Sequence, residues 1–469
     1  MKKSCWQKIR RSSLVGSMAL GVLSSCTVGP DYKRPEIDIP TIYKEAPEEW
    51  KIAEPQDQKD KGSWWEIFND PLLNHLQEEA TRANHTIKAL EAQYTQARTL
   101  VEATRGNFFP IITGNLSSGR TKPFSPITSL SPYNTHSTGL TASWEPDLWG
   151  NVRRLVESGN AQAEGLQAAL ENMRLSVQAL LANSYFQIRI LDNLQKLLDQ
   201  NVLSSQQLLT VVKNRYKQGT VSHLEVLKAE TAYKNAQLQA TDNRIARGQF
   251  QHALAVLLGK MPQNFTVDPI EYVFEQPSIP LGLPSTLLER RPDIAQAERQ
   301  MIQANAQIGV AITTFFPALT LSASGGFTSE SASSWFSGPS RVWALGASLA
   351  ATIFDSGIRS SQIKAAEAGY EQSASLYRQT VFSAFQEVED QLLVLKTLNE
   401  EQKIQNETVI NLERQTMITK DGHKVGINDA FTVLQTQLAL YGEQQKSLSL
   451  IGRKMTALVE LIKVIGGKW

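Results

Sequence analysis

Cysteine is almost absent from this chain of 469 residues, which contains only Cys5 and Cys26. Both lie near the start, so the rest of the chain has neither a disulfide framework nor a cysteine-based metal site. The six histidines form no HExxH motif, and the sequence contains no phosphate-binding loop and no nucleophile elbow. These absences argue against an enzyme, and we expect no cofactor and no metal.

Strong charge of one sign and long apolar runs are lacking as well. The 47 basic and 46 acidic side chains nearly balance, whereas a nucleic-acid-binding face would need an excess of basic residues. No run of 18 or more apolar residues follows residue 25, so the sequence predicts no transmembrane helix. A content of 41% hydrophobic and 20% charged residues nevertheless indicates an ordinary folded chain.

Proline is missing from two long stretches, since none occurs between Pro146 and Pro262 or after Pro339. Within these stretches, residues 151–218 and 358–425 are rich in Ala, Leu, Gln, Glu and Lys, which favour helices. As single helices these two segments would each extend about 100 Å.

Apolar residues recur at seven-residue intervals in the first of these segments, beside a second apolar stripe. The combined face is wider than a two-stranded coiled coil needs, so each helix is expected to pack on more than one neighbour. Breaks at Gly159 and Gly165 would instead give a compact bundle of shorter helices, but the sustained register favours unbroken rods. The seam comprises Leu170, Val177, Leu191 and Leu198.

The chain contains one pattern twice. Phe108-Phe109-Pro110 returns 207 residues later as Phe315-Phe316-Pro317. A repeat of this length exceeds the unit of a stacked solenoid, so it indicates a duplicated half-fold. The same interval separates Gly219 from Gly426 and Gly259 from Gly466.

Each predicted rod ends in a tight turn to another helix. Gly219 suits the C-cap of the first rod, and residues 222–225 fit a capping box that starts the next helix. Gly426 takes the same place in the second repeat, with Asn428 or Asp429 as the N-cap. Both hairpins should therefore lie at one end of the molecule, roughly 100 Å from the Phe-Phe-Pro segments.

A period of two, typical of strands, replaces the helical period after each Phe-Phe-Pro segment. Residues 319–328 and 343–353 alternate apolar with small or polar side chains, as residues 140–144 do briefly and residues 111–120 most weakly. Stretches of ~10 such residues suit membrane strands, although a small sandwich on a helical protein would show the same alternation. Four strands cannot close a barrel, so in a membrane they would need partners from one or two further copies of the chain. Aromatic residues that would form a girdle are Tyr133, Trp335, Phe336 and Trp343.

The N-terminus has the pattern of a secretion signal, with basic residues before the apolar segment Leu14–Leu23. Leu23-Ser24-Ser25-Cys26 resembles the cleavage box of bacterial lipoproteins, in which the cysteine becomes the acylated first residue. Thr27 favours sorting to the outer membrane. An ordinary signal peptide with a chance cysteine is the alternative, but we predict a signal over residues 1–25 and a lipid on Cys26.

Three further signatures are specific in combination. They are CTVGPDYKRP at residues 26–35, WWEIFNDP at residues 64–71, and RRPDI at residues 290–294, which is followed by Ala297-Glu298, Ala304-Asn305-Ala306 and the second Phe-Phe-Pro. With these motifs, nearly the whole chain resembles the TolC-type outer membrane factors, in the lipoprotein (OprM/NodT-like) branch of multidrug efflux systems.

The resemblance implies a mainly α-helical, internally duplicated fold with a small β part. It implies a homotrimer in which a 12-stranded outer-membrane β-barrel continues into a long periplasmic α-helical barrel. The function it implies is that of an exit duct for drugs or other small molecules, engaged by a periplasmic adaptor and an inner-membrane pump of the RND or ABC type. The alternative is a structural coiled-coil lipoprotein spacer, which would not need amphipathic strands. Polar residues expected to line the barrel are Ser322, Ser324, Ser348 and Thr352.

The expected organisation has five segments. They are the signal peptide 1–25, an N-terminal equatorial segment 26–63, a first repeat 64–260, an equatorial linker 261–283 and a second repeat 284–469.

The shared location of the hairpins makes their tips the expected docking points for the adaptor. The resting gate is expected just inside the second hairpin, where Phe431 and Gln435 share a helix face, with Val433 and Leu434 packing the flanking helices. Relatives often carry Asp where Gln435 aligns, so a ring of carboxylates is absent here and the gate is predicted to depend on Phe431 packing and Gln hydrogen bonds. The expected tip residues are Gly219, Thr220, Val221, Ser222, Val425, Gly426, Ile427 and Asn428.

Overall fold

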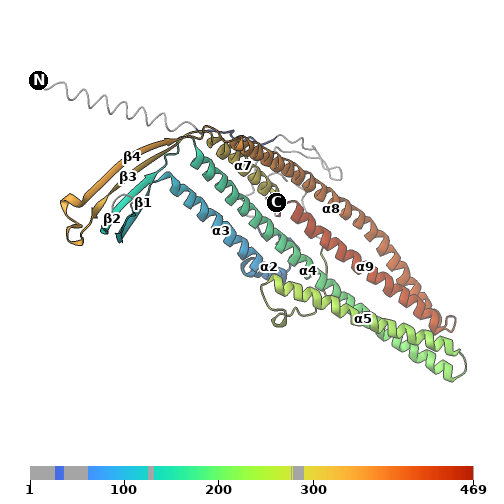
Figure 1. The fold of residues 1–469 in the computed structure, drawn as a ribbon. Coiled ribbons are helices and arrows are strands. Elements are labelled where there is room, and N and C mark those ends of the chain that lie inside the picture. The colour runs from blue at the N-terminus through green and yellow to red at the C-terminus, as the bar shows by residue number, and fades with distance from the viewer. Residues whose placement is uncertain (1–26, 36–61, 125–130, 276, 278–289, 468–469) are drawn as a thin grey trace. The chain divides into compact units, whose positions relative to one another are not determined.

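The computed structural model describes residues 27–35, 62–124, 131–275, 277 and 290–467 (Figure 1). The predicted signal peptide and Cys26 lie outside these residues. The chain divides into two compact units. Unit 1 contains the described residues of Met1–Glu36, Gln93–Gln167 and Gln296–Arg378, and unit 2 those of Ile37–Ala92, Ala168–Ala295 and Gln379–Trp469.

Two continuous helices of 67 residues each, α4 (Asn151–Lys217) and α8 (Ile358–Lys424), confirm the predicted rods. Gly159 and Gly165 do not break α4. A Cβ at Gly159 would lie 3.1 Å from a methyl group of Val101, so this glycine allows close packing instead of a break. None of the described helices is both long enough and apolar enough to cross a membrane.

Shorter helices complete each repeat. Helices α5 and α9 have 35 residues each and begin 207 residues apart, as α4 and α8 do. The shorter α-helices are α2 (Pro71–Ala83), α3 (His85–Arg105), α5 (His223–Leu257), α7 (Pro292–Thr313) and α9 (Ala430–Val464). The 3-10 helices are η1 (Trp64–Phe68), η2 (Gly106–Phe108), η3 (Pro262–Asn264), η4 (Ala332–Ser334) and η5 (Gly338–Ser340).

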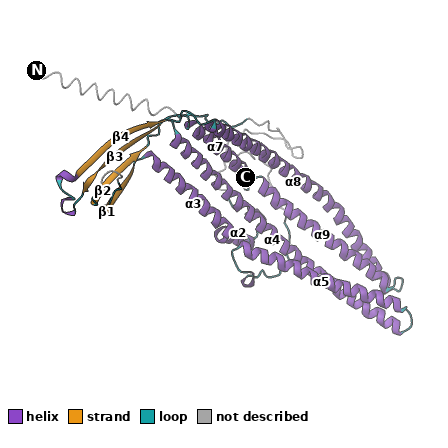
Figure 2. Cartoon of the chain, viewed as in Figure 1, coloured by secondary structure: helices purple, strands orange, loops and turns teal. Residues whose placement is uncertain are grey.

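Four antiparallel strands form one sheet in unit 1 (Figure 2). They pair in the order β1-β2-β3-β4, so strands from the two repeats meet where β2 pairs with β3. Within the described chain β1 and β4 each pair with one neighbour only. The strands are β1 (Ile111–Thr121), β2 (Tyr133–Trp144), β3 (Ala318–Ser329) and β4 (Arg341–Ala350).

The register sorts the side chains of the sheet onto two faces, as predicted. Leu140 lies opposite Gly325, and Gly325 opposite Trp343, so these positions share one largely apolar face. Ser322 and Ser324 belong to the other face, where small polar side chains prevail. We call these the apolar face and the polar face.

The prediction that a strand extends over residues 343–353 is wrong at its end, because β4 stops at Ala350. Its partner strand begins at Ala318, directly after Pro317, and a proline has no N–H to donate to the next rung of the ladder. Thr352 therefore lies beyond the sheet, where its carbonyl accepts a hydrogen bond of 2.8 Å from Arg359.

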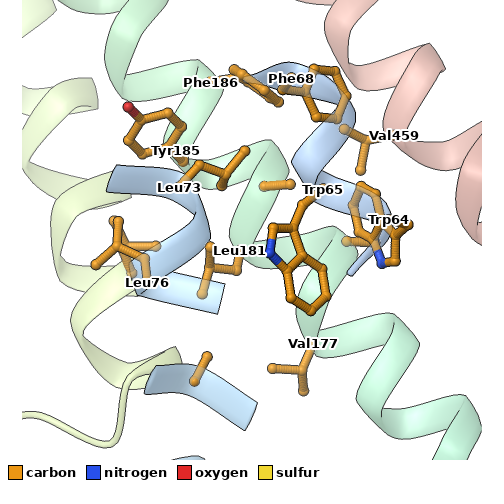
Figure 3. Close-up of a cluster of buried hydrophobic side chains, with 14 of the residues drawn as sticks. Trp64, Trp65, Phe68, Leu73, Leu76, Val177, Leu181, Tyr185, Phe186 and Val459 are labelled. Atoms are coloured by element: carbon orange, nitrogen blue, oxygen red, sulfur yellow. The ribbon is translucent and has the colours of Figure 1, made fainter. Parts of the chain in front are cut away.

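The largest buried cluster of unit 2 forms where η1 packs against α2 and α4 (Figure 3). Trp64 is fully buried, and its indole N–H donates to Oε1 of Gln178 over 3.1 Å. The rings of Phe68 and Phe186 meet edge to face at 4.8 Å. The aromatic side chains of the WWEIFNDP motif therefore anchor the start of the first repeat in the core.

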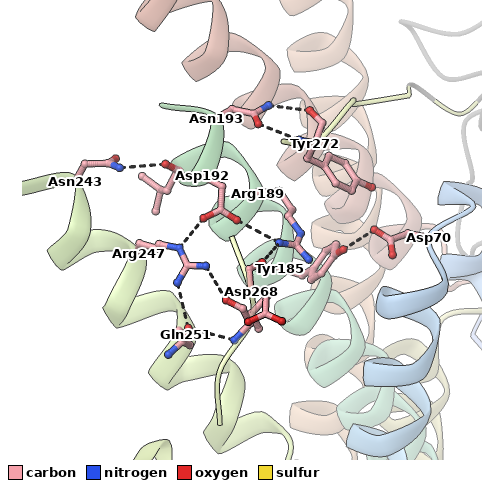
Figure 4. A network of polar contacts seen from close by, with 12 residues as sticks. Asp70, Tyr185, Arg189, Asp192, Asn193, Asn243, Arg247, Gln251, Asp268 and Tyr272 are labelled. Atoms are coloured by element: carbon pink, nitrogen blue, oxygen red, sulfur yellow. Dashed lines mark hydrogen bonds and ion pairs between the residues drawn. The ribbon is translucent and has the colours of Figure 1, made fainter. Parts of the chain in front are cut away.

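The linker after α5 is held to α4 and α5 by a buried ionic network (Figure 4). Arg247 donates to the carbonyl of Val267 over 2.7 Å, and Arg189 donates to that of Asp268 over 2.9 Å. Asp192 lies between the two arginines, at 2.6 Å and 3.2 Å. Loss of Asp192 would leave both arginines without their shared carboxylate, which is far more costly than loss of an exposed pair.

The segment that follows Cys26 is fixed within unit 1. The buried guanidinium of Arg154 donates to the carbonyls of Val28 and Gly29 over 3.2 Å and 3.1 Å. Arg34 forms a two-pronged ion pair with the carboxylate of Glu298, a residue of the mid-chain signature. That part of the signature therefore has a structural role.

Candidate functional site: the two hairpins

The first hairpin joins α4 to α5 through residues 218–222. Gly219 has φ +73°, in the left-handed region that favours glycine. The N–H of Thr220 donates to the carbonyl of Arg215 over 3.0 Å, and the N–H of Gly219 donates to that of Tyr216 over 2.9 Å. The long bond from Thr220 and the glycine in the left-handed region correspond to a Schellman cap. Val221 packs, half-buried, on a cluster of apolar side chains from α4 and α5.

The second hairpin repeats this backbone path but is fastened differently. Gly426 has φ +83°, and the N–H of Ile427 donates to the carbonyl of Gly422 over 2.8 Å. The Asn428 amide nitrogen donates to the carbonyl of Thr419 over 3.2 Å. A Cβ at Gly422 would lie only 2.4 Å from that nitrogen, so the Asn428 side chain occupies the space that glycine leaves open.

Helix capping differs between the hairpins, and one prediction is wrong. Ser222 stands at the N-cap of α5, but within the described chain its side chain makes no capping hydrogen bond. Glu225 instead accepts a 3.0 Å hydrogen bond from Lys228, so the reciprocal capping box is not formed. Of the two N-cap candidates for α9, the structure selects Asp429, which accepts a 2.7 Å bond from the N–H of Thr432. Hydrogen bonds from Thr432 hold the pKa of Asp429 below its usual value.

The two hairpins meet in unit 2 through one apolar cluster. Leu434 of α9 is 4% exposed and is buried among side chains of the first hairpin. Its buried partners are Leu208, Leu209, Val212, Val226 and Ala229. The predicted tips therefore belong to one packed region.

The tips present exposed apolar side chains beyond this cluster. Val425 is 72% exposed and Ile427 is 79% exposed, whereas Val221 and Asn428 are half-buried. Isolated exposed apolar residues are ordinary, but two at one turn suit a surface that another protein covers. The described residues contain no group of three His, Cys, Asp or Glu side chains that could hold a metal ion.

The predicted gate residues lie one turn apart on α9. Phe431 is half-buried and Gln435 is exposed, while Leu434 between them faces the buried cluster. Val433 is half-buried. Gln435 is therefore the more exposed of the two, while Phe431 lies beside the residues by which α9 packs on the first hairpin.

The packing of the Asn428 side chain on Gly422 was not predicted from the sequence. A glycine in the last turn of α8 is unusual, and the position 207 residues earlier holds Arg215. Comparison of the two repeats at this one position would have revealed that the second turn accommodates a side chain from elsewhere.

Comparison with known proteins gives a consistent result. The model of the family described as "Outer membrane efflux protein" matches residues 76–260 and 283–467, and the second match is offset by 207 residues at both limits. The solvent efflux pump outer membrane protein SrpC of Pseudomonas putida is 29% identical over 461 residues, covering 96% of this chain and 97% of the relative. The pyoverdine export outer membrane protein OpmQ of Pseudomonas aeruginosa is 29% identical over 439 residues, with coverage of 90% and 91%. The solved structure of the outer-membrane channel OprN superposes with a TM-score of 0.86 at 26% identity, covering 95% of this chain and 100% of that one.

Proposed function

The chain belongs to the outer membrane efflux protein family, and we propose that it is the exit duct of a tripartite efflux system. In this proposal three copies form the duct, and small molecules pass through it without chemical change. A periplasmic adaptor and an inner-membrane pump of the RND or ABC type engage it.

The observation that carries the proposal is the open four-stranded sheet with one apolar and one polar face. In lipid the free backbone groups of β1 and β4 would each cost several kcal/mol, so these edges need partners. Three copies supply 12 strands, which falls within the range of known membrane barrels. The apolar face then contacts lipid, and the small polar side chains of Ser322, Ser324 and Ser348 line the lumen.

The polar face also indicates how strongly the duct binds the molecules that pass through it. Its small hydroxyl side chains carry no charge, so we infer that the duct binds its cargo weakly and that the pump selects it. The relatives named for a solvent and for pyoverdine export, which are very different cargoes, support this view.

Planar-bilayer recording tests the proposal. Detergent-purified protein should insert and conduct ions, and chemical cross-linking of the same preparation should yield trimers. A coiled-coil spacer would give no conductance, because it has no closed barrel. Monomers without channel activity would therefore reject the duct.

We propose that the tips of both hairpins dock the adaptor, so that a trimer presents six similar points. Phe431 and Gln435 would close the resting duct just inside the second hairpin. In support, Val425 and Ile427 are exposed at the second tip, and Gln435 is exposed one turn after the half-buried Phe431.

We also propose that Cys26 carries the lipid. Thr27 lies against Gly150 at the start of α4, since a Cβ on that glycine would come within 2.9 Å of the Thr27 methyl. A closed barrel would hold the protein in the membrane without the lipid, so Cys26→Ser should abolish acylation and still allow insertion from a cleavable signal. Mass spectrometry of the mature protein decides, and an unmodified Cys26 would end this idea.

A further inference from the structure

The apolar face of the sheet carries a groove beside the β3–β4 loop. Its volume is about 660 Å³. Gly114 and Gly325 form its floor, since neither has a side chain to fill the row that also contains Leu140 and Trp343. A Cβ at Gly325 would meet nothing within 4 Å, so the space above this glycine is open.

The β3–β4 loop closes one end of the groove with aromatic rings. The ring of Phe336 lies 5.6 Å from that of Phe327 on the apolar face and stacks on Trp335 at 5.3 Å. Hydrogen bonds hold this loop, including one of 2.7 Å from the Ser340 hydroxyl to the carbonyl of Ser334. The wall is therefore a built part of the fold.

A cation without a partner borders the groove. Arg341 is exposed at the first position of β4, and among the described residues its guanidinium has no hydrogen-bond or ion-pair partner. A guanidinium beside an apolar groove matches a ligand with an acyl chain and an anionic oxygen-rich head, such as a phosphate.

We propose that this groove binds a phosphorylated lipid of the outer leaflet, with an acyl chain over Gly325 and a phosphate on Arg341. This inference rests on the proposed function, which places the apolar face in lipid and the loops on the outside of the cell. A site of this kind differs from general lipid contact because it selects a head group at one residue.

Native mass spectrometry of the detergent-purified protein tests the site, with lipid A and phosphatidylethanolamine as the probes. Wild type should retain lipid A in preference to phosphatidylethanolamine. Arg341→Gln should weaken lipid A binding about 10-fold, the loss typical of one hydrogen-bonded charge, because lipid A carries anionic phosphate monoesters. It should weaken phosphatidylethanolamine less, because the ammonium of that zwitterionic lipid already balances the charge of its phosphate diester. Gly325→Leu should fill the groove and weaken both lipids.

Two matched controls share the sheet but not the groove. Arg120→Gln removes another strand arginine, and Gly119→Leu adds a side chain at an open glycine of the polar face, so both should bind lipid A as wild type does. Equal lipid A binding by wild type and Arg341→Gln, or no preference between the lipids, would overturn the site. Bilayer recording of the same preparations distinguishes failure of the lipid site from failure of the proposed duct. If only the lipid site is absent, the protein still conducts ions. If wild-type protein shows no conductance, the duct itself is rejected.

Discussion

The two hairpins have the same backbone but different fastenings. Gly219 and Gly426 both adopt positive φ at the end of a 67-residue helix, and the same long backbone bond closes each turn. The first turn is then held by Val221 in an apolar cluster, and the second by Asn428 against Gly422. After a duplication, backbone geometry thus fixes the turn, while the side chains that secure it can differ.

The largest expected effect comes from replacing the glycine with positive φ that the two hairpins share. Val at Gly219 or Gly426 would place a β-branched residue at positive φ, with strain of roughly 1–2 kcal/mol or more. We expect Gly219→Val and Gly426→Val each to abolish export of a fluorescent substrate while trimers persist on native gels.

Matched controls are available on the adjoining helices. Gly248 of α5 and Gly442 of α9 have open space where a Cβ would lie and no positive φ, so valine at either position should preserve export. Normal export by both tip variants would show that the tips are not the docking site.

The next largest effect concerns the gate, which we propose lies in the second hairpin only. Phe431→Ala should raise the resting single-channel conductance several-fold, whereas Leu224→Ala, its counterpart 207 residues earlier, should not. Gln435→Asp should introduce sensitivity to acid and to divalent cations, because a ring of carboxylates would then titrate near ~4. If Phe431→Ala leaves conductance unchanged, the gate lies elsewhere.

A smaller effect tests how the second turn is fastened. Asn428→Ala and Gly422→Ala should each loosen residues 419–428 by about 1 kcal/mol, because each removes the same contact. Hydrogen exchange there should speed up about 5-fold, and the double variant should add little. Val221→Ala should leave the coupling between Asn428→Ala and Gly422→Ala unchanged, because Val221 packs on the apolar cluster and not on Gly422. Additive effects of Asn428→Ala and Gly422→Ala would show that the contact does not couple them.

The smallest effect is the pH dependence of the helix caps. The folded-state pKa of Asp429 is lowered, so its capping contribution is present above the ordinary carboxylate pKa and is lost as pH falls through the lower folded value. We expect amide exchange at the start of α9, corrected for intrinsic rates, to rise in that acid window. Exchange at the start of α5 should not, because Ser222 carries no charge. Asp429→Ser should make the two helices alike, and an unchanged pH response in that variant would contradict the assignment.

Local periodicity made the rods, the two-faced sheet and the glycine turns predictable from the sequence. The errors arose where another residue competes for the predicted partner: Pro317, on the neighbouring strand's side, shortens β4, and Lys228, one turn along α5, takes the carboxylate that the capping box required. The contacts of Arg154 with the N-terminal segment lie more than a hundred residues apart in sequence, so no local pattern could indicate them. The packing of Asn428 on Gly422 could be predicted only by comparing the two repeats, where Arg215 occupies the position that corresponds to Gly422.

Pro317 limits the length of the β3–β4 ladder at one end. It has no N–H, and its carbonyl accepts a 2.7 Å bond from the indole of Trp149, so both of its ladder groups are withdrawn from strand pairing. The ladder therefore cannot lengthen toward α7 by slipping or adding a rung. In a thicker or thinner bilayer, a barrel of such strands would have to change its tilt or deform the lipid, since Pro317 keeps the β3–β4 ladder from lengthening at this end.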